Sequence, residues 1–214
     1  MSKLLLALSI ICSTFFVHSK QISISVLSEL NMQVGNIVVY VTPKNPKPGN
    51  TSSNVASMDQ VNTQFLPHIL VIQKDTQIRF PNSDSIKHHV YSFSQAKTFE
   101  LQLYKELHAD PLLFSKLGSV ELGCNIHDWM LGYIFVVDTP YFGKTDIKGN
   151  LTLNLPDGEY QIDIWHPRIQ DKFSSLSRQL FLPGESEIKI RLQSPLLPDV
   201  SLYEEISEEF SDYE

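Results

Sequence analysis

Cysteine is scarce in this sequence, which excludes a fold held together by disulfides. Only Cys12 and Cys124 occur among the 214 residues. Cys12 lies in an N-terminal apolar run that we expect to be removed, so Cys124 would be the only cysteine of the mature chain. A single cysteine cannot close an intramolecular disulfide and needs another explanation in an exported protein. With 42% apolar residues, the chain can bury a core without disulfides.

Basic residues are also few, and no basic patch stands out from the acidic background. Lys and Arg number 17 against 24 Asp and Glu, which leaves a formal charge of -7 at pH 7. This balance excludes nucleic acid as an expected partner. Acidic residues are dense near the C-terminus, and we predict that residues 195–214 form a solvated, disordered tail. A docking element for a basic partner is the alternative.

No apolar run is long enough for an ordinary membrane span, but the N-terminus has the pattern of a cleaved signal peptide. Lys3 precedes an apolar run at residues 4–17, and small residues suit a cut after Ser19. The run is shorter than the roughly 20 residues of a spanning helix, which disfavours the alternative of an uncleaved anchor. We therefore predict that residues 1–19 are a signal peptide, that the protein is periplasmic, and that it has no stable membrane insertion after cleavage.

Short β-like runs dominate the mature chain and predict an all-β fold. The expected strands cover residues 21–26, 36–42, 68–73, 76–80, 88–93, 98–104, 119–122 and 133–137. The one expected helical turn before residue 137 lies at residues 110–116. Many short strands at this spacing indicate a β-sandwich or a barrel.

A second β-rich region begins near residue 138. Residues 151–155 and 160–165 alternate between apolar and polar side chains on either side of a Pro-Asp-Gly turn, which predicts a hairpin. Two further runs, residues 179–182 and 188–192, complete the region. We predict a small C-terminal module over residues 138–194, either as a separate domain or as extra strands on the first sandwich.

Three metal donors lie within residues 123–130. Cys124 and His127 are three positions apart, and Met130 follows after another three. Soft thiolate and thioether donors select copper, and imidazole suits it well. Zinc is less favoured, because methionine is an unusual zinc ligand. A regular helix would point the first and last donors to different sides, so we expect a tight loop between two strands. The alternative is a chance grouping of a buried cysteine, a surface histidine and a core methionine.

Two separated motifs resemble the plastocyanin-type cupredoxins. They are Phe80-x-Asn82-x5-His88-x-Val90 and Gly123-Cys124-x2-His127-x2-Met130-x-Gly132-x-Ile134-x-Val136. The region up to about residue 137 is similar to plastocyanin-like proteins labelled methylamine utilisation proteins, and the short spacing from histidine to methionine resembles that of amicyanin. The resemblance implies a cupredoxin-like Greek-key β-sandwich over residues 20–137 that holds one copper ion cycling between Cu(I) and Cu(II).

The resemblance also implies the ligands. It assigns two histidine ligands, a thiolate and an axial thioether to His88, His127, Cys124 and Met130 respectively. His89 is the alternative to His88, and strand alternation alone cannot choose between them, because adjacent residues face opposite ways. The eight-residue step from Phe80 and the following His-x-Val pattern favour His88.

Other residues near these motifs are candidates for roles other than binding the metal. Asn82 and Asp128 are candidates for the hydrogen bonds that brace metal ligands. Trp129 could shield the metal, present an aromatic surface to a partner or plug the core. The C-terminal module resembles transthyretin-like or carboxypeptidase-regulatory-like β-sandwich modules, which implies binding or scaffolding without chemistry.

These features predict an exported type 1 (blue) copper protein that carries single electrons between two redox proteins and is not an enzyme. Its acidic charge predicts redox partners with basic docking surfaces, since complementary charge raises association rates. One alternative is a periplasmic copper-binding or delivery protein without a redox role. Another is a metal-free β-sandwich binding module.

Overall fold

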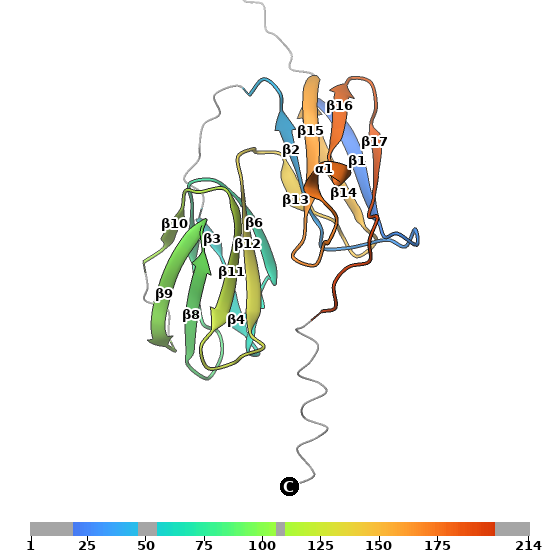
Figure 1. The fold of residues 1–214 in the computed structure, drawn as a ribbon. Coiled ribbons are helices and arrows are strands. Elements are labelled where there is room, and N and C mark those ends of the chain that lie inside the picture. Colours follow the sequence, from blue (N-terminus) through green and yellow to red (C-terminus); the bar gives the residue numbers. More distant parts are fainter. Residues whose placement is uncertain (1–18, 47–54, 106–109, 200–214) are drawn as a thin grey trace, which may run out of the picture.

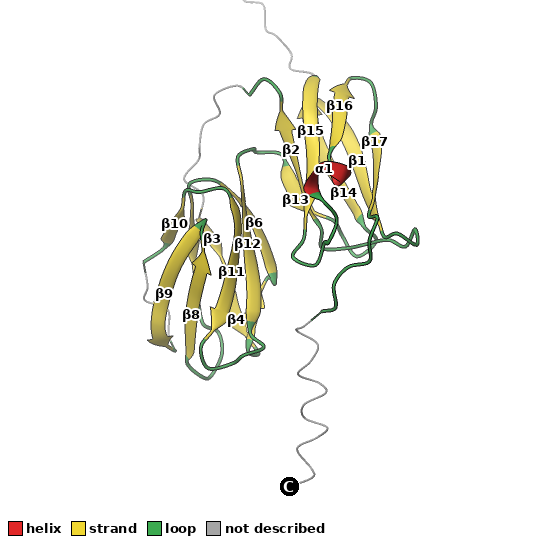
Figure 2. Cartoon of the chain, viewed as in Figure 1, coloured by secondary structure: helices red, strands yellow, loops and turns green. Residues whose placement is uncertain are grey.

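The structure is built almost entirely from β-strands, as Figures 1 and 2 show. It is a computed structural model that describes residues 19–46, 55–105 and 110–199. The predicted all-β fold class is confirmed. Within the described residues no helix is long and apolar enough to cross a membrane. Residues 1–18, which hold most of the expected signal peptide, and the acidic residues 200–214 lie outside the described part of the chain.

The strands form two sandwiches that lie side by side in Figure 1. In the first sandwich, one sheet has the order β6 (Ile69–Gln73), β12 (Leu131–Val137), β11 (Gly118–Cys124), β8 (His88–Ser94) and β9 (Lys97–Tyr104). The other has the order β10 (Leu112–Phe114), β7 (Thr76–Arg79) and β3 (Val55–Ser57). A separate hairpin joins β4 (Asp59–Val61) to β5 (Gln64–Leu66).

The expected helical turn at residues 110–116 is wrong. Residues 112–114 form β10, which pairs antiparallel with β7. Phe114 is fully buried in the core between the sheets, where it packs near Phe80 and Phe99. Burial of this aromatic side chain and pairing with β7 outweigh the weak local preference for a turn.

The first sandwich places alternate residues of each strand in its core. On β11, Val120, Leu122 and Cys124 are buried, whereas Ser119 and Glu121 are exposed. Successive side chains of a strand point to opposite faces, so the core-facing set of β11 ends at Cys124. The sulfur atom is therefore carried to the end of the sandwich by the same alternation that buries the apolar residues.

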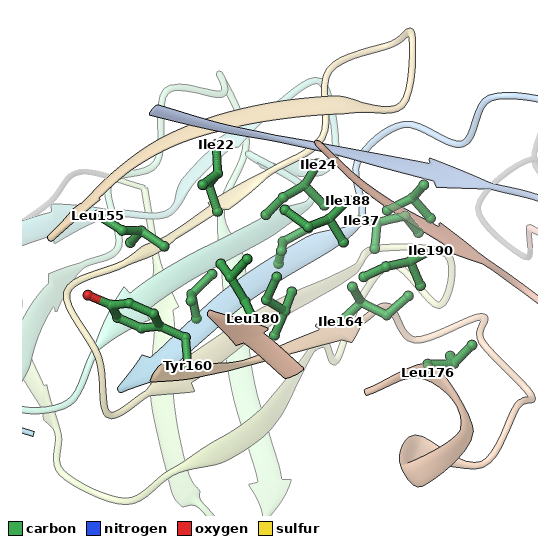
Figure 3. Packing of buried hydrophobic residues seen from close by; sticks show 14 of the residues in the cluster. Ile22, Ile24, Ile37, Leu155, Tyr160, Ile164, Leu176, Leu180, Ile188 and Ile190 are labelled. Atoms are coloured by element: carbon green, nitrogen blue, oxygen red, sulfur yellow. The ribbon is translucent and has the colours of Figure 1, made fainter. Parts of the chain in front are cut away.

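The second sandwich combines strands from both ends of the described chain. One sheet has the order β14 (Asn150–Pro156), β1 (Ser19–Leu27) and β17 (Glu187–Arg191). The other has the order β13 (Phe142–Lys144), β2 (Val38–Pro43), β15 (Gly158–Trp165) and β16 (Arg178–Leu182). Figure 3 shows the core between them, to which β1 contributes Ile22 and Ile24. The short helix α1 (Phe173–Leu176) adds Leu176 to this core.

This pairing corrects the expected domain organisation. β1 lies between β14 and β17, and β2 lies between β13 and β15, so both belong with the C-terminal strands. Residues 20–137 are therefore not one unit, and residues 138–194 are not a complete module. The first sandwich is formed within residues 55–137, and the second adds residues 19–43 to the C-terminal strands.

The expected hairpin around Pro156-Asp157-Gly158 is also wrong. β14 pairs with β1 in one sheet, whereas β15 pairs with β2 and β16 in the other. The Pro-Asp-Gly segment therefore crosses between the two sheets. Each of the two strands has one face toward the same core, which explains their alternation without any pairing between them.

An apolar contact joins the two sandwiches. The Trp165 ring stacks on Phe135 with ring centroids 4.4 Å apart and an interplanar angle of 16°. Val38 and Ile69 are fully buried in the same cluster. Lys144 Nζ on β13 also donates a hydrogen bond of 2.6 Å to the carbonyl oxygen of Ile69 on β6.

Candidate metal centre

The candidate donors meet at one end of the first sandwich, where β8 begins and β11 ends (Figure 1). His88 is the first residue of β8, and Cys124 is the last residue of β11. The two strands pair antiparallel, with Cys124 opposite Val90. This pairing brings together side chains that are 36 positions apart in the sequence.

His127 and Met130 lie in the loop between β11 and β12, so the predicted loop between two strands is confirmed. Antiparallel pairing holds Gly123 opposite Leu131, which forces the chain to reverse within a few residues. The amide of Met130 donates to the carbonyl oxygen of His127 at 3.0 Å and closes a turn inside the loop. The loop thus holds its donors close to the end of β11.

Three donor atoms form a compact group. The Sγ atom of Cys124 lies 3.8 Å from His88 Nδ1 and 3.7 Å from His127 Nδ1. One ligand atom from each of these residues lies within 4.8 Å of the others. Atoms that bind the same metal ion can lie at such distances from one another even though they form no strong bond with each other. His88 and Cys124 are buried, and His127 is half-buried, so the group can hold a metal ion largely shielded from water.

Met130 belongs to the same end of the core. Its side chain is 2% exposed and lies in the apolar cluster that contains Cys124. Both residues also line one cavity, together with Tyr91 and Leu131. The thioether is thus shielded from solvent and shares a core cluster and a cavity lining with Cys124.

His88 lies in the donor group, whereas His89 does not. The alternation along β8 buries His88 and directs His89 toward the outer face of the sheet. There His89 Nε2 forms a hydrogen bond of 2.9 Å with the largely exposed Glu100 carboxylate. The structure therefore places His88, and not His89, beside Cys124.

Asp84 holds the other side of the His88 ring. His88 Nε2 lies 2.7 Å from Asp84 Oδ2, and the Asp84 carboxylate is only 11% exposed. Because an ionised carboxylate only accepts hydrogen bonds, Nε2 of His88 donates this one. In the neutral ring, the lone pair of Nδ1 then faces the Sγ atom of Cys124. Burial alone would raise the pKa of Asp84, but hydrogen bonds from the Thr63 amide, His88 and the Asn62 amide lower it below its usual value.

Sequence reasoning missed Asp84. Asn82, which was expected to brace the site, donates from Nδ2 to the carbonyl oxygens of Ile86 and Tyr104 and so shapes the loop before β8. Asp128 is exposed in the ligand loop. Asp84 lies in the same polar stretch as Asn82. Its spacing of four residues from His88 would predict a side-chain contact on a helix, but it predicts none in a loop that leads into a strand.

Trp129 lies at the surface beside the donor group. It is 39% exposed, so it is not a core plug. Its ring centroid lies 5.4 Å from that of His127, and its Nε1 donates a hydrogen bond of 3.4 Å to Thr63 Oγ1. The side chain thus covers one side of His127 and connects the ligand loop to the β4–β5 hairpin.

Comparisons with known proteins give partial likenesses. No family model matches the chain, and no curated protein does. One similar structure is the copper-containing nitrite reductase from Thermus scotoductus SA-01, with 20% identity and a TM-score of 0.38 over 46% of this chain. The match spans about a quarter (26%) of that enzyme's own length.

Two further similar structures are cupredoxins. A proline-to-glycine mutant of amicyanin, in its reduced Cu(I) form at pH 4, shows 16% identity and a TM-score of 0.36 over 46% of this chain and 99% of its own. A purple cupredoxin from Nitrosopumilus maritimus shows 21% identity and a TM-score of 0.35 over 38% of this chain and 99% of its own. The resemblance to proteins labelled methylamine utilisation proteins is not confirmed by these matches.

Proposed function

We propose that this chain is an exported type 1 (blue) copper protein that carries one electron at a time between redox partners. The observation that supports the proposal is the group of His88, Cys124 and His127, with Met130 buried in the same cluster. Two imidazoles, one thiolate and one thioether are the donor set that suits copper in electron-transfer sites. The residues present therefore fit the ion that the donor motif predicts.

Each residue has a distinct part in this proposal. His88 and His127 present nitrogen lone pairs, and Cys124 supplies a thiolate whose sulfur gives the electron a covalent route into β11. Met130 would supply a thioether as a weaker donor, which would tune the potential. The copper ion, when bound, supplies the one-electron change between Cu(I) and Cu(II). The protein itself would catalyse no reaction.

The setting of the donors favours electron transfer over copper delivery. His88 and Cys124 are anchored in paired strands, and Asp84 orients His88 from behind. Donors fixed in this way move little when the ion changes its charge, whereas a delivery site has to open for release. In the periplasm, the acidic protein would meet redox partners with basic docking surfaces, because charge complementarity speeds encounter.

Visible absorption and electron spin resonance of Cu(II)-loaded protein test the proposal. We expect one equivalent of copper, an intense thiolate-to-copper band and narrow hyperfine splitting. Cys124→Ser should abolish the band, because an alcohol cannot replace the thiolate ligand. Reversible cycling without metal loss separates an electron carrier from a delivery protein. A pale wild-type product would contradict the blue-copper assignment.

The two neighbouring histidines form a matched pair for a second test. His88→Ala should abolish the thiolate-to-copper band, because it removes a donor from the group. His89→Ala should leave the band in place, since His89 pairs with Glu100 on the outer face. Loss of the band in His89→Ala with retention in His88→Ala would contradict the assignment.

A further inference from the structure

The carboxylate of Asp84 is shared between His88 and the β4–β5 hairpin. Oδ2 lies 2.7 Å from His88 Nε2 and accepts a hydrogen bond of 2.9 Å from the amide of Thr63. Oδ1 accepts a hydrogen bond of 2.6 Å from the amide of Asn62. One side chain therefore ties the residue that opens β8 to the tip of a hairpin that belongs to neither large sheet.

The hairpin tip has an unusual backbone conformation. Asn62 and Thr63 both have positive φ, at 52° and 54°. Asparagine tolerates this left-handed region, but for β-branched threonine it is a genuine outlier. Such conformations persist where the surroundings hold them in place, and they cluster at functional sites. Here the two amides of the tip both point at the Asp84 carboxylate, which is the contact that holds them.

The same tip also supports the ligand loop. Thr63 Oγ1 accepts a hydrogen bond from Trp129 Nε1, and the Trp129 ring packs against His127. A chain of contacts thus runs from His88 through Asp84 and Thr63 to Trp129 and His127. Both histidines of the donor group are therefore connected to one network that contains the Asp84 carboxylate.

We propose that Asp84 is a positioning residue that holds His88 in the Nε2-protonated form and sets the reduction potential of the site. The inference rests on the proposed function and goes beyond its ligand set. A carboxylate that accepts the imidazole proton makes the ring a stronger donor. A stronger donor with a negative charge behind it stabilises Cu(II) more than Cu(I), so Asp84 lowers the potential.

The decisive variant is Asp84→Asn, with Glu100→Gln as the matched control. Each change removes one negative charge from a histidine–carboxylate pair, but Glu100 contacts His89 outside the donor group. We expect Asp84→Asn to weaken Cu(II) binding relative to Cu(I) by about 10- to 100-fold. At 59 mV for each tenfold change, the potential rises by about 60 to 120 mV. Glu100→Gln should shift it far less.

A second measurement does not depend on copper. In metal-free protein, nitrogen NMR of the His88 ring should report the Nε2-protonated form in the wild type and a mixture of tautomers in Asp84→Ala. This measurement tests whether Asp84 positions His88, and its result does not depend on copper. A missing thiolate-to-copper band in the wild type would contradict the proposed function but would leave this test valid. It is made on folded protein, with the His127 ring as an internal reference.

Two outcomes would overturn the inference. One is an Asp84→Asn potential that moves no further than that of Glu100→Gln or falls. The other is an unchanged His88 tautomer in Asp84→Ala. If the metal-free variant is only less stable, and the reduction potential and the His88 tautomer are those of the wild type, Asp84 has a structural role only. If Asp84→Asn does not fold, Asp84→Ser takes its place with the same expected direction.

Discussion

At the scale of single residues, side-chain direction along a strand decides what can reach the site. β8 buries His88 and turns His89 outward, and β11 ends its core-facing series at Cys124. The close packing beneath the ligand loop also depends on a single residue. Gly132 lies opposite Leu122 in the β11–β12 pairing, and the ring of Phe65 covers its backbone.

Gly132→Ala should therefore destabilise the first sandwich. A Cβ atom there would lie 2.7 Å from Phe65 Cβ and 2.9 Å from the ring, so the buried ring would have to move. Overpacking of this kind costs about 1–3 kcal/mol, measured by chemical denaturation of the metal-free protein. Gly158→Ala is the control, because its new Cβ would meet only ordinary contacts from 3.4 Å outward. Equal stability of the two variants would contradict this account of the packing.

At the scale of elements, the second sandwich depends on β1. This strand pairs antiparallel with β14 and parallel with β17, so it is the central strand of its sheet. Its core-facing residues Ile22, Ile24 and Val26 are fully buried. A sheet that loses its central strand loses both of its strand pairings, and we expect the C-terminal strands to need residues 19–27 in order to fold.

Ile24→Ala tests this dependence. Truncation of a fully buried isoleucine leaves a cavity and should cost about 2–5 kcal/mol in the free energy of unfolding. Ser23→Ala, on the exposed face of the same strand, should stay within about 0.5 kcal/mol of the wild type. Circular dichroism during urea unfolding measures both. A similar stability for the two variants would show that β1 is not a central strand in solution.

At the scale of the whole molecule, a half-buried histidine and a buried one lie close to the contact between the sandwiches. The ring of His68, just before β6, meets Tyr133 edge-on with centroids 5.5 Å apart. His166 follows β15 and is 8% exposed. Burial, with Arg168 and His68 nearby, lowers the pKa of His166 to about 4. Burial also lowers the pKa of His68. Both rings are therefore neutral in the folded protein near pH 7.

This arrangement predicts a loss of stability in mild acid. The His166 pKa is about 4 when folded and about 6.5 when unfolded, so between these values the unfolded state binds more protons. Stability is therefore complete above about pH 6.5 and falls as the pH drops toward 4, by up to about 2 kcal/mol at pH 5 relative to pH 7. Chemical denaturation at pH 7 and at pH 5 measures the loss of stability. The difference in the free energy of unfolding between the two pH values should be smaller in His166→Gln. If that variant shows the same difference as the wild type, the loss comes from other titratable groups.

Much of the candidate site could be predicted from the sequence because three of its donor residues lie close together in the chain. Cys124, His127 and Met130 lie within seven consecutive residues, and donor chemistry alone points to a soft metal. The short alternating runs also determined that the fold would be all-β. The predicted hairpin at residues 156–158 failed for a related reason, since alternation reports one buried face and does not say which strand lies alongside.

The pairing of strands that are distant in the sequence depends on tertiary packing. β1 joins strands more than 120 positions away, because the C-terminal strands close their core only with its isoleucines. Asp84 reaches His88 and the hairpin tip because three separate segments meet at one end of the first sandwich. Local sequence patterns were enough to identify Cys124, His127 and Met130 as donors and to locate most of the strands. The packing that buries apolar surface determined which strands pair and which carboxylate stands behind the first histidine.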